Sequence, residues 1–227
     1  MMKKKLAVLS VGVAISLFVA QAATAAEVTV NSITTAYGLF DLDLADISYD
    51  SDTFTTTILL DVSKFVAEAP STTTLNPFLD RQFDTISFEL AAAPNERITK
   101  ISYSESLETI VTHDTGDFSF TSSTGSVFVN NVYNGLGVFN QMSPTSGTSL
   151  FTLGTSYVIP GIETELDVSI TNDIMAFAYG DAYAKVMKNN YAKVEVKSSA
   201  VPIPATLWLF GSAITGLAAL RRKGQEA

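Results

Sequence analysis

The residues best suited to bind a ligand are the aspartates of one short acidic segment, residues 40–52, which reads FDLDLADISYDSD. Calcium is bound by about six to eight oxygen atoms from carboxylates and carbonyls. The candidate calcium ligands are Asp41, Asp43 and Asp46. The segment lacks the glycine and the distal glutamate of an EF-hand loop. A second interpretation also fits, in which Leu42 and Leu44 point inward from a strand and the aspartates face solvent.

Residues that could support catalysis are few. The chain has no cysteine and one histidine, His113, which is followed by Asp114. A serine hydrolase holds its nucleophile, base and acid together, but no Gly-x-Ser-x-Gly segment is present to expose a serine. Glu105 and Glu108 could act as the paired carboxylates of a glycosidase, although such pairs are expected without function in an acidic chain. We therefore predict a protein that is not an enzyme and needs no cofactor, and a secreted hydrolase is the least favoured alternative.

Aromatic side chains on a surface could stack on sugar rings. The candidates for this role are Tyr103, Tyr133 and Tyr157. Large aromatic side chains are more often buried than exposed. Most of the 14 Phe and 8 Tyr residues are therefore expected in the core.

The charge balance excludes some partners. The chain has 14 Lys and Arg against 23 Asp and Glu, a formal net charge of −9. Because basic clusters lie near both ends, residues 26–200 are more acidic still, and no Lys or Arg occurs between Ile101 and Ala184. Nucleic-acid binding requires basic groups that displace counterions from phosphates, so nucleic acid is excluded as a partner. Anionic lipid headgroups are disfavoured for the same reason.

Apolar and polar residues alternate along most of the chain, which is typical of strands with one buried face. Alternation is clearest in residues 53–62, 84–90, 117–121, 164–170 and 191–197, and further strands are expected in residues 27–33, 97–104, 126–132 and 174–179. In residues 117–121 the alternation places Phe118 and Phe120 together on one face. About ten short strands predict an all-β fold, an antiparallel β-sandwich of the jelly-roll or immunoglobulin-like kind, over residues 26–200.

Residues that tolerate positive φ mark the expected turns. Turns are predicted at Thr124-Gly125, Asn134-Gly135 and Ser146-Gly147, and a hairpin at Asn189-Asn190. Residues 65–69 are interpreted as one helical turn or a loop, and residues 135–149 as a long irregular stretch.

Residues 1–25 have the physical features of a secretory signal peptide. Three lysines, Lys3 to Lys5, precede an apolar stretch that would form the signal helix. Ala23 and Ala25 satisfy the small-x-small rule, so the mature chain is predicted to begin at Ala26. Export would then use the Sec machinery and carry the body across the inner membrane.

The C-terminal residues 201–227 form a second membrane-directed segment. Val201-Pro202-Ile203-Pro204 is stiff because each proline fixes φ. Residues 205–220 carry no charge, and Arg221, Arg222 and Lys223 follow directly. An uncharged run ended by basic residues predicts a membrane helix whose basic end is cytoplasmic, although the run is shorter than the roughly 20 residues of a permanent span.

These C-terminal residues resemble a PEP-CTERM sorting signal, the substrate sequence of an exosortase in Gram-negative bacteria that make exopolysaccharide. The resemblance is limited to about residues 201–223, and Ile203 stands where the family's name has glutamate. The residues that carry it are Val201, Pro202, Pro204, Trp208, Phe210, Gly211, Ser212, Arg221, Arg222 and Lys223. An ordinary C-terminal anchor is the alternative interpretation.

The resemblance implies a protein that is membrane-anchored before processing and placed on the cell surface or in the extracellular matrix afterwards. We expect a structural or adhesive role associated with exopolysaccharide or biofilm. The alternative is a carbohydrate-binding module for the producer's own exopolysaccharide.

Overall fold

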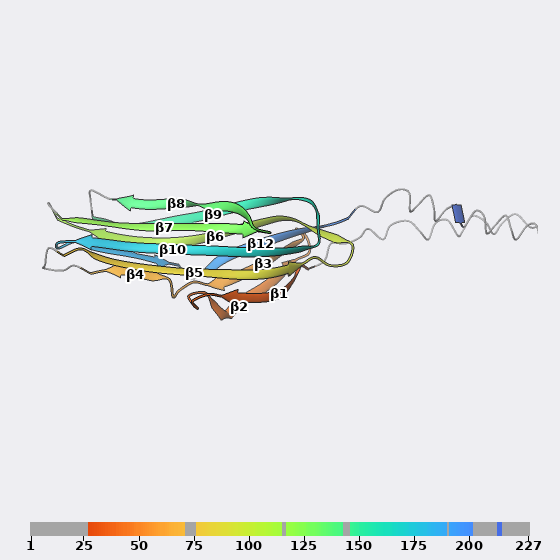
Figure 1. Ribbon diagram of the computed structural model, residues 1–227, viewed down its shortest axis with the longest axis horizontal. Helices are drawn as coiled ribbons and strands as arrows, with labels where there is room; N and C mark the ends of the chain where they lie inside the picture. Colours follow the sequence, from red (N-terminus) through yellow and green to blue (C-terminus); the bar gives the residue numbers. More distant parts are fainter. Residues whose placement is uncertain are drawn as a thin grey trace, which may run out of the picture.

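The computed structural model describes residues 27–70, 76–114, 117–142, 146–189, 191–201 and 213–214, without the side chains of residues 43–44 and 133–142. Its strands run along the long axis of an elongated body (Figure 1). The first sheet, sheet A, has the order β1 (Thr29–Thr35), β5 (Phe78–Ala91), β10 (Glu165–Tyr179), β7 (Phe118–Val129) and β8 (Val132–Met142).

The second sheet, sheet B, is built around the long strand β6 (Glu96–Thr112). Its order is β2 (Asp41–Asp50), β3 (Thr55–Asp61), β12 (Tyr191–Ala200), β6, β11 (Tyr183–Lys188) and β4 (Val66–Ala69), and β9 (Gly147–Glu163) also pairs with β6. All the strand pairs of both sheets are antiparallel.

The two sheets enclose one apolar core, which confirms the predicted antiparallel all-β sandwich. Sheet A contributes Ile86, Phe88 and Ile170 to this core, and sheet B contributes Ile58 and Val194. Each of these residues alternates with a neighbour on the outer face, as the period-two pattern predicts. The two predicted flanking helices lie outside the described residues, except for Ala213 and Ile214, which have helical backbone.

The predicted hairpin at Asn189-Asn190 is wrong. Tyr183 of β11 pairs with Thr112, and Lys193 of β12 pairs with Ser104, so β11 and β12 follow β6 one after the other in the same direction. The backbone N–H of Asn189 donates to the carbonyl oxygen of Ser106 at 2.8 Å. This bond holds the short break between β11 and β12 against β6. The chain therefore continues in the same direction instead of reversing.

Strands β3 and β4 also follow one another in the same direction, alongside β12 and β11. β3 pairs with β12 and β4 pairs with β11. The two interruptions lie side by side, because the backbone N–H of Lys188 donates to the carbonyl oxygen of Phe65 at 3.0 Å. Residues 66–69, interpreted from sequence as a helical turn or a loop, are therefore strand β4.

The hairpin between β7 and β8 turns at a place that the sequence analysis missed. Val129 pairs with Val132, and Asn130 and Asn131 between them have φ values of 47° and 64°. Positive φ at both central residues is typical of a type I′ turn, which matches the twist of the flanking strands. Thr124-Gly125 and Asn134-Gly135, predicted as turns, lie within β7 and β8, and most of the predicted irregular stretch is strand.

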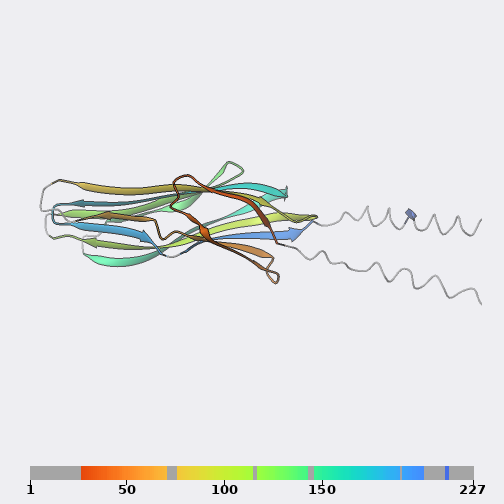
Figure 2. The same cartoon turned by 90° about the horizontal axis from the view of Figure 1, so that it is seen from below.

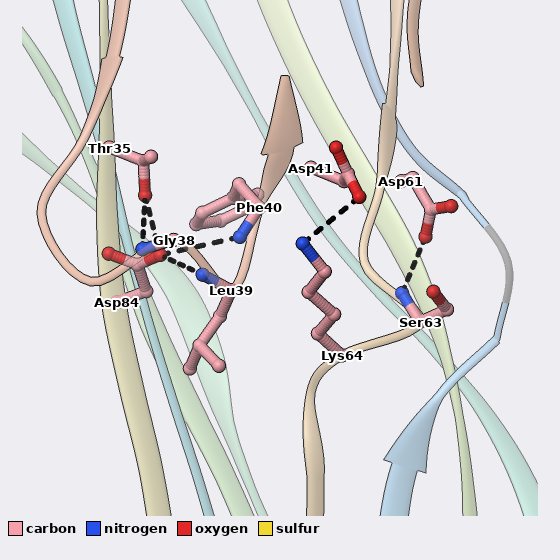
Figure 3. A network of polar contacts seen from close by, with 9 residues as sticks. All are labelled: Thr35, Gly38, Leu39, Phe40, Asp41, Asp61, Ser63, Lys64 and Asp84. Carbon is pink, nitrogen blue, oxygen red and sulfur yellow. Dashed lines mark hydrogen bonds and ion pairs between the residues drawn. The ribbon is translucent and has the colours of Figure 1, made fainter. Parts of the chain in front are cut away.

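A buried carboxylate on β5 fixes the connection from sheet A to sheet B (Figure 3). Asp84 accepts hydrogen bonds from the Thr35 hydroxyl at 2.6 Å and from the backbone N–H groups of Tyr37 and Leu39, both at 2.8 Å. Burial opposes its ionisation, but these hydrogen bonds and that from the Thr85 N–H outweigh burial and hold the pKa of Asp84 below its usual value.

Both ends of the described body lie at the same end of the sandwich (Figure 2). The backbone N–H of Val28 donates to the Thr56 hydroxyl at 3.0 Å, and that of Ser198 donates to the carbonyl oxygen of Phe54 at 3.1 Å. We call this the terminal end, and the end at which β10 finishes the far end.

Candidate functional site

Strand β7 turns its aromatic face to solvent. Ser119, Thr121 and Ser123 are buried, whereas Phe118 and Phe120 lie on the outer face of sheet A, and Phe118 is 44% exposed. The expectation that most phenylalanines are buried fails here. The two sheets lie close together at this end, where Cα atoms of β10 lie within 8 Å of those of β4 and β11. The small side chains that point inward from β7 allow this close approach.

The aromatic residues at the far end of sheet A lie against one another. The Phe120 and Phe177 rings are stacked, with centroids 5.2 Å apart and an interplanar angle of 22°. The Phe118 ring lies 5.7 Å from Phe120 and 5.9 Å from Phe177. Leu79 of the neighbouring strand β5, which is 56% exposed, pairs with Phe177 of β10. We call Phe118, Phe120, Phe177 and Leu79 the aromatic platform.

An ion pair borders the aromatic platform toward the middle of the face. Arg81 of β5 donates through Nε to Asp173 Oδ1 at 2.8 Å, and a second contact joins its Nη2 to Asp173 Oδ2. The two contacts form the bidentate fork that is typical of an arginine paired with a carboxylate. Beyond it lies a second pair of rings, Tyr37 and Phe83, with centroids 5.9 Å apart.

The rest of the outer face of sheet A carries hydroxyl groups. Thr85 and Thr171 contact each other at 3.2 Å, and Ser87 and Ser169 at 3.4 Å. Toward the terminal end the face forms an open hollow of about 340 Å³. The hollow is lined by Ser32, Thr34, Ser87, Phe88, Glu89, Phe128, Asn131, Asp167, Val168 and Ser169. The face thus passes from aromatic rings to hydroxyls and carboxylates along one direction.

Sugar rings are amphipathic, with C–H groups on their faces and hydroxyls at their edges. The C–H groups stack on the electron-rich faces of aromatic rings, and the hydroxyls hydrogen-bond to polar side chains. Binding sites for such ligands combine apolar surface with a few placed polar groups. The outer face of sheet A offers both, and exposed aromatic patches of this kind mark interaction sites in soluble proteins.

The three tyrosines selected from sequence do not make up this site. Tyr103 is 2% exposed and belongs to the core, so its prediction as a sugar-stacking residue is wrong. Tyr157 is half-buried and packs against the core from β9. The side chain of Tyr133 lies outside the described residues. Alternation in residues 117–121 was the signal for Phe118 and Phe120, but alternation does not say which face is buried.

Tyr103 is part of a buried polar cluster that links the two sheets. Its hydroxyl donates to Glu105 Oε2 at 2.5 Å and accepts from Asn172 Nδ2 of β10 at 2.9 Å. Lys188 Nζ contacts the same Glu105 oxygen at 2.5 Å and lies 4.7 Å from the centroid of the Phe65 ring. Burial and the Glu105 charge raise the pKa of Tyr103, whereas burial lowers the pKa of Lys188 against the opposing effect of Glu105. We call Tyr103, Glu105, Asn172 and Lys188 the inter-sheet cluster.

The other residues considered for catalysis do not form a constellation. Glu105 points into the core, and Glu108 lies on the opposite face of β6, so the two are not a carboxylate pair across a substrate. His113 Nδ1 contacts the Ser119 hydroxyl at 3.2 Å, but Ser119 is buried and its hydroxyl donates to the Thr112 carbonyl.

The predicted calcium ligands lie on β2, the edge strand of sheet B. Asp41 Oδ2 forms an ion pair with Lys64 Nζ at 3.0 Å (Figure 3), and Asp46 is exposed. A register shift separates these two residues, and the side chain of Asp43 lies outside the described residues. Within the described part of the chain, no group of three or more His, Cys, Asp or Glu residues is arranged to hold a metal ion.

The sorting and cleavage residues cannot be placed, apart from Val201. Its backbone N–H donates to the carbonyl oxygen of Asn95 at 2.9 Å. Outside the described residues lie Ala23, Ala25, Ala26, Pro202, Pro204, Trp208, Phe210, Gly211, Ser212, Arg221, Arg222 and Lys223. Where the chain is described, no helix is both long enough and apolar enough to cross a membrane.

Comparisons with known proteins give no family. No family model matches the sequence, and no curated protein matches it. Among solved structures, CBM27-1 of Caldicellulosiruptor saccharolyticus in complex with mannohexaose is 12% identical over 74% of this chain and 96% of its own, with a TM-score of 0.23.

Two further solved structures are similar over smaller shares of their own length. The CBM22-1–GH10 modules of Clostridium thermocellum endo-1,4-β-D-xylanase 10B, complexed with xylohexaose, are 11% identical over 69% of this chain and 26% of theirs, with a TM-score of 0.18. Tailspike protein 4 of bacteriophage CBA120 is 14% identical over 72% of this chain and 19% of its own, with a TM-score of 0.14. Scores this low carry no argument about function.

Proposed function

We propose that this protein is an exported β-sandwich that binds polysaccharide through the outer face of sheet A. The observation that supports the proposal is the aromatic platform, where Phe118, Phe120 and Phe177 lie in contact on a solvent-facing surface. Burying these rings inside the sandwich would be the ordinary outcome. Their exposure costs hydration free energy that a stacked sugar would recover.

The same face favours a neutral polysaccharide over an acidic one. Glu89 and Asp167 line the hollow, and the whole chain carries a formal net charge of −9. Like charges repel and raise the free energy of the complex. Binding of a neutral chain should therefore depend little on salt, whereas an acidic chain would need salt to screen the repulsion.

Affinity electrophoresis in gels that contain the producing organism's exopolysaccharide, or neutral and acidic reference polysaccharides, tests the proposal. Replacing both Phe118 and Phe177 with Ala should lower the affinity by roughly tenfold to a hundredfold, because each aromatic contact contributes about 1 kcal/mol. Tyr191→Ala is the matched control, since Tyr191 is an exposed aromatic on sheet B. The proposal fails if the double variant and the control are retarded like the unmodified protein.

We further propose that residues 1–25 are removed on export and that residues 201–223 are a sorting signal for an exosortase. The supporting features are the signal-peptide pattern and the order of proline, WLFGS and basic cluster. Intact-mass measurement on protein extracted from the cell surface should show the loss of both ends. Recovery of an intact C-terminus would favour the plain anchor instead.

Calcium binding by Asp41, Asp43 and Asp46 is a separate proposal, supported only by the density of carboxylates. Specific binding would raise the melting temperature with calcium more than with sodium at equal ionic strength. Asp43→Asn with Asp46→Asn should abolish that difference. If calcium and sodium raise the melting temperature equally, the proposed calcium site is contradicted.

A further inference from the structure

One long side of the sandwich is free of charge. No Asp, Glu, Lys, Arg or His occurs between Phe118 and Ile162, a stretch that contains β7, β8 and all of β9 except its last residue, Glu163. β8 is the last strand of sheet A, and β9 lies beyond β6 at the edge of sheet B. The opposite edge of sheet B is β2, which carries Asp41, Asp46 and Asp50.

Strand β9 has the features that exposed sheet edges usually avoid. Natural edge strands are kept from pairing with other chains by charges, prolines, bulges or short length. β9 is 17 residues long, has no charge before Glu163, and contains one proline, Pro160. Leu150 and Val158 on its outer face are 71% and 70% exposed. Among the described residues, β6 is the one strand with which the segment Leu153–Val158 pairs, and the register shift in that pairing lies after Val158.

The charge distribution identifies what could occupy this edge. The chain is acidic, so two copies repel one another over most of their surfaces. The uncharged side is where a second copy can approach without that cost. An antiparallel strand pair has a two-fold axis and can therefore form between identical strands in a closed, self-complementary interface.

We propose that β9 pairs antiparallel with β9 of a second copy through Leu153–Ile159, so that sheet B continues from one copy into the other. Each newly formed backbone hydrogen bond replaces one to water, and pairing covers the backbone of an exposed, uncharged edge. The aromatic platform lies on sheet A and stays exposed in both copies. This assembly is independent of polysaccharide binding and would make any such binding bivalent.

Single-cysteine cross-linking of the full chain in mild detergent tests the proposal. The protein has no cysteine, so Thr152→Cys, Ser156→Cys and Val158→Cys each introduce one thiol on the outer face of β9. A disulfide needs Cα atoms about 4.4–6.8 Å apart. In the proposed register Ser156 faces Ser156 of the second copy, so mild oxidation should give a covalent dimer with Ser156→Cys and much less with Thr152→Cys or Val158→Cys.

Ser48→Cys on β2 is the matched control, because Ser48 is an exposed hydroxyl residue on the opposite, acidic edge of the same sheet. In addition, Thr152→Lys with Ser156→Lys should convert the dimer to a monomer in sedimentation velocity, since the paired lysines repel each other. The proposal is overturned if the unmodified chain is monomeric at micromolar concentrations. It is equally overturned if the control cross-links as readily as the β9 variants, or if the lysine variant stays dimeric.

Discussion

The two ends of the sandwich are filled in opposite ways. Toward the terminal end, large apolar side chains such as Ile86, Phe88 and Leu90 fill the space between the sheets. At the far end the interior is lined by alanines and small hydroxyl residues, among them Ala176, Thr121 and Ser123, and the large aromatic residues of β7 and β10 face outward. The inter-sheet cluster lies between the region with large apolar side chains and the region with small ones.

This difference separates stability from recognition. Burial of large apolar side chains is the main source of folding free energy, and the terminal end supplies most of it. The far end buries little apolar surface per residue and presents its phenylalanines to solvent. Backbone pairing and the inter-sheet cluster must therefore maintain the far end, and predictions about the two ends differ in sign and size.

The largest expected effect of a polar substitution comes from the inter-sheet cluster. Glu105→Ala leaves the Lys188 amine buried without its carboxylate, which should lower the free energy of unfolding by about 3–5 kcal/mol. Adding Lys188→Met should recover most of that loss, because the unpaired charge is then gone. Chemical denaturation measures both. A double variant no more stable than Glu105→Ala would show that the cost comes from packing and not from charge.

A somewhat smaller effect is expected at Asp84, near the same boundary. Asp84→Asn should lower the free energy of unfolding by about 2–3 kcal/mol, since several hydrogen bonds to a charged acceptor are weakened. The folded-state pKa of Asp84 is below that of the unfolded chain, which is about 4. Its contribution is therefore complete above about pH 4 and is lost as the pH falls through the folded-state pKa.

Acid unfolding curves followed by circular dichroism check this prediction. The Asn variant should lose less stability between about pH 4 and pH 2 than the unmodified protein. Asp181→Asn, at an exposed carboxylate between β10 and β11, is the control and should leave the stability at neutral pH nearly unchanged. Parallel acid curves for the two proteins would show that Asp84 does not determine the acid limit.

The polar lining of the far end predicts a stabilising substitution. The Thr121 hydroxyl is buried and has no hydrogen-bond partner among the described residues. Thr121→Val keeps the shape of the side chain and removes the unsatisfied group, so we expect a gain of about 1 kcal/mol in the free energy of unfolding. Thermal melts would detect it. A loss instead of a gain would indicate a bound water that satisfies Thr121.

The smallest effect on stability is expected at the aromatic platform itself. Phe118→Ser should change the free energy of unfolding by less than about 1 kcal/mol, because the side chain is already 44% exposed. Phe88→Ala at the terminal end should cost about 3–5 kcal/mol in the same denaturation experiment. If the two substitutions cost the same, the contrast between the ends would not hold.

The sequence was sufficient for the fold class and insufficient for the site. Period-two alternation identified many of the strands and the sandwich architecture, because the pattern follows directly from strand geometry, but it did not give β9, β4 or the order of the strands. Alternation does not determine which face of a strand is buried. In β7 Ser119, Thr121 and Ser123 are buried, whereas Phe118 is exposed and Phe120 lies on the same outer face. That choice depends on the spacing of the sheets at the far end, which is a tertiary property.

Residue preferences alone also did not predict the turn positions correctly. Thr124-Gly125 and Asn134-Gly135 are suitable turn residues, but a turn there would break the pairing of β7 with β10 and β8. Asn130-Asn131 satisfies the same preference and keeps both strands intact. Asn189-Asn190 lies at a break between two strands and not at a chain reversal. Lys188 points into the core and contacts Glu105, and the next residue, Asn189, stays hydrogen-bonded to β6.

The position of the two chain ends has a mechanical consequence. The described body is entered and left at the terminal end (Figure 1), whereas the residues of the aromatic platform lie at the far end, where β10 finishes. A force between Val201 and a ligand held at the far end would act along the strands. Antiparallel hydrogen bonds are perpendicular to the strands, so such a pull would shear many of them together, and strand β12, paired on both sides with β3 and β6, would resist extraction along its whole length.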